Sequence, residues 1–170
     1  FASCSLITSF GATFQNTGVE EIPENLFSGN PLVTSYGQTF RGCKNLRSVP
    51  AGLFAASISA TVFTNVFSEC SALEVVGAGL LNTTAVTTVG YLFDGCASLH
   101  SDVNTIFNLA SYPEIVTTTA IFRSCALLAG KGLVFMGKVP NVTAHYYAFY
   151  ACAGLDDYDA FPGNWITNKL

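Results

Sequence analysis

The chain has 170 residues, of which 50% are hydrophobic and only 11% charged, and its net charge is −4. This composition is too apolar for a disordered segment and long enough for one folded domain. No apolar stretch approaches the roughly 20 residues that cross a bilayer, and the 7 Lys and Arg residues are spread singly, without the basic stripe that nucleic acid requires. We therefore expect one domain with neither a membrane span nor a nucleic-acid partner.

The N-terminal residues lie inside a repeated pattern. Phe1-x-x-Cys4 aligns with Phe27-x-x-Asn30, and no series of charged, apolar and cleavage-site residues typical of a secretion signal opens the chain. A repeat stack that is cut open exposes the apolar side of a coil. The expectation is therefore a fragment of a longer protein, with more chain or a cap upstream.

A pattern of Phe, Cys and Leu at three-residue spacing recurs through the rest of the chain. Its cysteines follow one another at steps of 27, 26, 29 and 27 residues, a period typical of stacked solenoid units. A degenerate copy starts at Phe14 and has Thr17 in place of cysteine. Coils are thus predicted to start near Phe14 and at the Phe of each full copy. The full copies are Phe40-Cys43-Leu46, Phe67-Cys70-Leu73, Phe93-Cys96-Leu99, Phe122-Cys125-Leu128 and Phe149-Cys152-Leu155.

Each coil is predicted to contain a short strand and helical turns. In residues 46–50 the pattern places Leu46 and Val49 inward and Arg47 outward, and residues 73–76 are comparable, which favours short parallel strands. Proline after such a strand removes a hydrogen-bond donor and starts a helical turn. A second helical turn is expected over 34–43, where Tyr36 and Phe40 are four residues apart and would share one face.

The recurring phenylalanines and cysteines are predicted to form two buried structural columns. Cysteines one coil apart stack at about the 4.8 Å spacing of neighbouring strands, whereas a disulfide needs Cβ atoms about 3.8 Å apart. We therefore expect free, buried thiols that act as small apolar residues. The predicted columns are Phe40, Phe67, Phe93, Phe122 and Phe149, and Cys43, Cys70, Cys96, Cys125 and Cys152.

The segment Phe93-Asp94-Gly95-Cys96-Ala97-Ser98-Leu99 resembles the BspA-type leucine-rich repeats of bacterial surface proteins. Similar repeats occur in gut and oral bacteria and their phages, and the class includes adhesins. Together with the period, the resemblance implies an α/β fold, a right-handed leucine-rich-repeat solenoid of about six coils of 26–29 residues that spans 1–170 as a single domain. It also implies a location on the bacterial cell surface or in secreted form.

Signals for catalysis, metals and cofactors are weak. The two histidines, His100 and His145, occupy different repeat positions, so we expect ordinary surface histidines and no metal site. The cysteines recur at a core position, which disfavours a nucleophile, and no phosphate-binding glycine motif occurs. The acidic run 156–159 lacks the spacing of a calcium loop. We expect no enzyme activity, no cofactor and no metal.

The outward strand positions are the predicted partner-binding face, since solenoids use the surface lined by strands for partners. A merely solvated face is the alternative. Tyrosines near the C-terminus could also stack against sugar or protein, or pack within the repeat. The strand row is Arg47, Glu74, His100, Ala129 and Asp156, and the tyrosines are Tyr146, Tyr147, Tyr150 and Tyr158.

Two functions remain open from the sequence. Repeats without reactive clusters favour a non-catalytic module of a bacterial surface or secreted protein that binds protein or glycan in adhesion. The alternative is a rigid structural spacer or a phage tail-associated assembly segment. Self-association through exposed solenoid ends is a further expectation, because an uncovered coil leaves apolar surface open.

Overall fold

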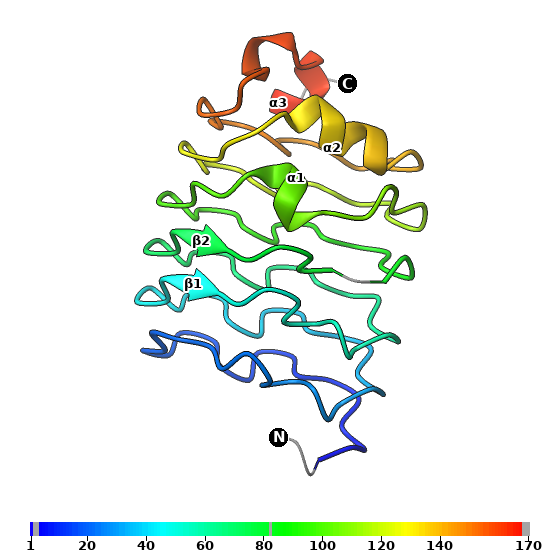
Figure 1. Ribbon diagram of the computed structural model, residues 1–170. Coiled ribbons are helices and arrows are strands. Elements are labelled where there is room, and N and C mark those ends of the chain that lie inside the picture. The colour runs from blue at the N-terminus through cyan, green and yellow to red at the C-terminus, as the bar shows by residue number, and fades with distance from the viewer. Residues whose placement is uncertain (2–3, 82, 168–170) are drawn as a thin grey trace.

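The chain winds into successive coils that stack from the N-terminal to the C-terminal end, as the computed structural model shows (Figure 1). The structure describes residue 1 and residues 4–81 and 83–167. Residues 2–3, 82 and 168–170 of the predicted domain lie outside this part. The buried hydrophobic side chains form one continuous cluster along the stack. Most of the backbone lies in turns and loops rather than in regular elements.

The regular elements are short. β1 (Ser48–Val49) and β2 (Val75–Val76) pair in parallel, with Ser48 opposite Val75, and both lie within the segments predicted as strands. The inner residue of each strand, Val49 or Val76, is buried and the outer one is exposed. The helical elements all follow β2. They are α1 (Val103–Ile106), α2 (Gly132–Lys138), the 3-10 helix η1 (Tyr158–Ala160) and α3 (Gly163–Ile166).

A second line of parallel pairing runs the length of the stack through single bridges. Each bridge joins a residue to its equivalent in the next coil, 26 to 29 residues later. The pairing therefore follows the period of the Phe and Cys pattern. The bridged residues are, in order, Ser9, Ser35, Val62, Thr88, Thr117 and Ala144.

The segment after each bridge is not the helix that the sequence predicts. Over 34–43 the structure has turns, and Gln38 and Gly42 have φ angles of 63° and 71°, which interrupt a right-handed helix. Gln38 donates its N–H to the carbonyl of Thr64 in the next coil at 2.9 Å. The helix prediction over 34–43 is wrong because the neighbouring coil supplies the hydrogen bonds that a helix would make internally.

We call these segments the turn face. Each of them places left-handed residues two positions before and two positions after its phenylalanine, and most of these residues are not glycine. The regular alternation lets every second N–H point along the stack. The turn face comprises residues 10–16, 36–42, 63–69, 89–95, 118–124 and 145–151.

The phenylalanines of the turn face form one continuous column of stacked rings, which we call the Phe column. Phe93 illustrates it: its ring is parallel within 7° to that of Phe67 and within 6° to that of Phe122, with centroids 5.5 Å away on both sides. Offset stacking of this kind adds to the burial of each ring. The column consists of Phe14, Phe40, Phe67, Phe93, Phe122 and Phe149.

The last coil is covered by chain that does not follow the repeat. Trp165 of α3 stacks on His145 with ring centroids 4.5 Å apart, and Phe161 packs on Phe149 at 4.7 Å. The carbonyl of Trp165 also accepts the N–H of Phe149 at 3.1 Å. This C-terminal cap therefore takes the place of a further coil.

Candidate functional site

Five cysteines lie in one buried column beside the Phe column. Each thiol donates a hydrogen bond to the carbonyl of the phenylalanine one coil earlier; the Sγ–O distance from Cys96 to Phe67 is 3.1 Å. Every cysteine described is free, and Cys4, unlike the others, is exposed. The thiols of this column are Cys43, Cys70, Cys96, Cys125 and Cys152.

These thiols are therefore more than small apolar residues, because each ties one coil to the previous one. Burial raises the pKa of Cys70 and of Cys152 to about 12 and that of Cys96 well above its usual range. A neutral S–H is the form that can donate to a carbonyl. A thiol held neutral makes a poor nucleophile, so the column has a structural role.

The predicted strand row is only partly continuous. Arg47 and Glu74 form an exposed ion pair at 3.1 Å, and His100 follows Glu74 through a backbone hydrogen bond. The row then breaks, because Ala129 pairs with Asp102 and not with His100. The sequence alignment, in which His100 and Ala129 occupy equivalent repeat positions, is therefore wrong at this step.

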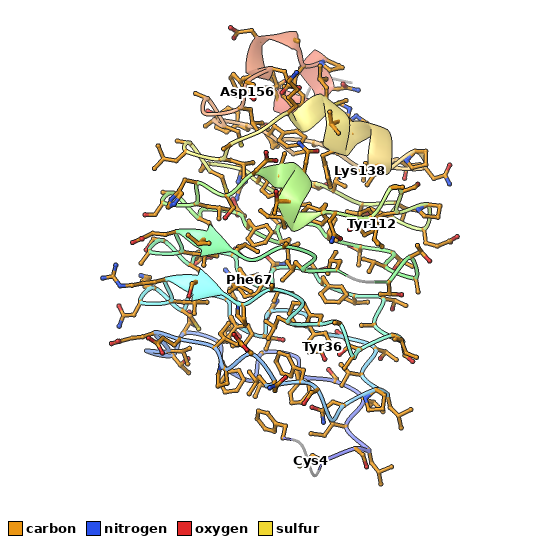
Figure 2. All side chains as sticks on the ribbon, viewed as in Figure 1. Cys4, Tyr36, Phe67, Tyr112, Lys138 and Asp156 are labelled. Atoms are coloured by element: carbon orange, nitrogen blue, oxygen red, sulfur yellow. The ribbon has the colours of Figure 1, made fainter. Side chains whose placement is uncertain are left out.

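Asp156 lies near the C-terminal end of the stack, far from Cys4 at the other end (Figure 2). It lines a hollow of about 440 Å³ together with Asp157 and Asp159. The Asp157 carboxylate accepts the N–H groups of Gly132 and Leu133 at 2.9 and 3.1 Å, so it caps the start of α2. Within the described residues, no three His, Cys, Asp or Glu side chains are placed to share a metal ion.

The two histidines differ in burial. His100 is exposed, as expected. His145 is half-buried and stacks under Trp165, and in the part of the chain that the structure describes neither of its ring nitrogens has a hydrogen-bond partner. Burial lowers the pKa of His145. The prediction of a surface histidine is therefore wrong for His145, which is half-buried beneath the C-terminal cap.

The most organised polar group on the surface joins three successive coils, and we call it the Tyr–Arg patch: Tyr91, Asp94, Arg123, Tyr147 and Tyr150. Arg123 donates to both carboxylate oxygens of Asp94, from Nε at 2.7 Å and from Nη2 at 2.6 Å. Its guanidinium also lies over the ring of Tyr91, 5.7 Å from the centroid. Asp94 is the largest cause of a raised pKa at Arg123, and the Tyr91 and Tyr147 hydroxyls contribute.

Two of the four tyrosines predicted as a cluster belong to this patch. Tyr147 and Tyr150 meet edge to face with centroids 5.7 Å apart, and Tyr150 is 46% exposed. Tyr158 packs against the core and its hydroxyl accepts the N–H of Ala151. Tyr146 lies beside His145. The packing alternative therefore describes Tyr158 and the surface alternative Tyr150, whereas Tyr146 and Tyr147 are both half-buried.

The sequence contained a signal for the missed members of the patch. Asp94 and Arg123 both follow a phenylalanine of the repeat directly, as Tyr150 does. When the position directly after each repeat phenylalanine is aligned from coil to coil, the acid Asp94, the base Arg123 and the aromatic Tyr150 fall in one line.

The comparisons with known proteins add no relative. No protein-family model matches the chain, and no curated protein matches it significantly. In the part of the chain that the structure describes, no helix is both long and apolar enough to span a membrane.

Proposed function

We propose that the chain is a non-catalytic recognition module that binds a protein or a glycan through the Tyr–Arg patch. The observation that supports this most is the fixed position of Arg123, held by two hydrogen bonds to Asp94 and by the ring of Tyr91. In line with the resemblance of its repeats, the module would serve adhesion in a bacterial surface or secreted protein.

A fixed arginine beside exposed tyrosines suits recognition for physical reasons. The Arg123 side chain is 40% exposed, and among the described residues no group accepts a hydrogen bond from its Nη1. It can thus donate to a ligand without first losing conformational freedom, which lowers the cost of binding. Tyr147 and Tyr150 add rigid rings that stack on apolar surfaces or sugar rings.

The strand row supports binding less well. Arg47 is 72% exposed in its side chain and meets Glu74 through one oxygen, and such surface pairs contribute little and move freely. Beyond His100 the row loses its register. The Tyr–Arg patch therefore replaces the strand row as our leading binding surface.

The test is binding of the purified chain to a panel of matrix proteins and glycans, followed by surface variants. We expect Tyr150→Ala and Arg123→Gln each to weaken the interaction by about tenfold or more, as residues at the centre of an interface do. Arg47→Gln is the matched control, since it removes an exposed, paired arginine outside the patch. Loss of binding in Arg47→Gln alone would favour the strand row, and no binding to either class would leave the spacer as the better proposal.

A rigid spacer, or a phage tail-associated assembly segment, is the second candidate. The unbroken Phe column and the thiol bonds between coils favour it, because they give each coil the same stiff contact with its neighbours. In a spacer, changes in the Tyr–Arg patch would leave every function of the parent protein intact. A change in the number of coils would instead alter the distance that the spacer spans.

A further inference from the structure

The acidic and basic side chains of the turn face neutralise one another in two ion pairs. Arg41 donates to a carboxylate oxygen of Glu69 at 2.6 Å, and Arg123 meets Asp94 at the same distance. Among the residues of the turn face, all of which the structure describes, His145 is the remaining basic one, and burial lowers its pKa. The turn face is therefore uncharged as a whole near neutral pH and suits a ligand without net charge.

One position of the turn face offers polar groups that make no hydrogen bond within the described residues. It lies two residues before the phenylalanine of each coil, where Gln38, Asn65, Tyr91 and Tyr147 have φ angles of 57° to 63°. All four residues are half-buried, and their side-chain oxygen and nitrogen atoms are not fully covered. Because glycine adopts this conformation at less cost, the stacking of coils alone does not require these side chains.

The spacing of the coils favours a chain of sugars over an extended peptide. Neighbouring rings of the Phe column from Phe40 to Phe149 are 5.5 to 5.7 Å apart. An extended peptide directs a side chain to the same face only every 6.6 Å or about that, so it loses register after a few coils. A pyranose ring, built from bonds of about 1.5 Å, adds roughly 5 Å to an extended chain. Sugars therefore stay closer to the register of the coils.

We propose that the turn face binds one linear, uncharged polysaccharide chain that lies along the stack, with one sugar on each coil from Gln38 to Tyr150. This rests on the recognition function proposed above and names its ligand. Tyr147 and Tyr150 would stack on sugar rings at one end, beside the Nη1 donor of Arg123. The carboxamide of Gln38, and that of Asn65 in the next coil, would donate to and accept from sugar hydroxyls further along.

An acidic polysaccharide fits the same face less well. Both arginines of the turn face already donate to carboxylates, Arg41 to Glu69 and Arg123 to Asp94. A carboxylate or sulfate on each sugar would have to compete with these acids, and it would find no lysine on the turn face. Like charges brought together in this way disfavour binding.

The test measures how affinity depends on the length of the sugar chain. Calorimetric titration of the purified chain uses linear β-1,4-linked oligosaccharides of glucose, N-acetylglucosamine, mannose and xylose, each in lengths of two to six units. We expect at least one series to gain affinity up to about five units, by about tenfold or more in total, because each added contact joins those already made. For a neutral face, the affinity should change by less than about twofold between ionic strengths of about 0.01 and 1 M.

Two glycine variants locate the far end of the sugar chain. Gln38→Gly and Asn65→Gly remove only the side chains, at positions where glycine readily keeps the left-handed conformation. Each should weaken binding of the six-unit chain by about threefold or more and leave binding of the two-unit chain, held by the Tyr–Arg patch, unchanged. Tyr150→Ala should weaken both. Asn45→Ala, at an exposed asparagine outside the turn face, is the matched control and should change neither.

The possible failures can be told apart. Equal affinity for the two-unit and six-unit chains, or an equal effect of Gln38→Gly on both, would overturn the extended mode of binding and leave recognition at the Tyr–Arg patch intact. Binding of a protein or an acidic polysaccharide alone, with none of the neutral oligosaccharides bound, would overturn it in the same way. Binding of nothing from either panel would overturn the recognition function as well.

Discussion

Truncation of Phe93 to alanine tests the stacking of coils most directly. The ring is fully buried and is sandwiched between the rings of Phe67 and Phe122. Removal of a buried phenylalanine costs about 3–5 kcal/mol, because the contacts are lost and a cavity remains. For a chain of 170 residues, about 1 kcal/mol corresponds to a shift of about 2–4 °C in Tm. The expected loss is therefore roughly 6–20 °C, measured by thermal unfolding followed with circular dichroism.

The matched comparison is Phe14→Ala at the open end of the same column. Phe14 is only partly buried and stacks on one parallel neighbour, Phe40, so its truncation should cost about half as much as that of Phe93 or less. Leu6→Ala, at a side chain that is 83% exposed, should leave the midpoint unchanged. An unchanged midpoint for Phe93→Ala, or equal losses at Phe93 and Phe14, would refute the view that neighbouring coils stabilise one another through this column.

Three further outcomes follow from single contacts. Cys96→Val removes the thiol donor to the Phe67 carbonyl and should lower the free energy of unfolding by about 1 kcal/mol more than Cys96→Ser, which keeps a donor; urea titration of both variants measures the difference. Because burial lowers the pKa of His145, the unfolded chain binds the proton more readily, so stability should fall as pH drops below about 6.5; His145→Phe should flatten the dependence of Tm between pH 5 and 7, and an unchanged slope would contradict the burial of this ring. Asp157→Ala should cost about 0.5–2 kcal/mol, since two N–H groups at the start of α2 lose their acceptor; a midpoint equal to that of the parent chain would speak against this cap.

The features of the fold that repeat from coil to coil could be predicted from the period of the sequence. Phenylalanine and cysteine recur at core positions, so their spacing alone predicts buried columns, and the structure places Phe93 and Cys96 fully inside. The alternation around β1 likewise marks which residues face inward. Such positions can be recognised because burial in a stack imposes the same demand on every coil.

The turn conformation could not be predicted in the same way. Gln38 and Asn65 have φ angles of 63° and 58°, although neither is glycine and the four-residue spacing of Tyr36 and Phe40 is that of a helix. The hydrogen bonds that decide between the two conformations come from the next coil, which local sequence does not reveal. For the Tyr–Arg patch, the partners Asp94 and Arg123 lie one coil apart, so only the register shows that they meet.

Because each coil from Cys43 to Cys152 contains one buried thiol, cysteine labelling can show which coil unfolds first. A cysteine-alkylating reagent must reach the sulfur atom, and the buried sulfurs of the column become accessible only when their own coil unfolds locally. Cys4 should take the label at once in the native protein, and Cys152 and Cys43, at opposite ends of the column, should then report by mass spectrometry which end frays first.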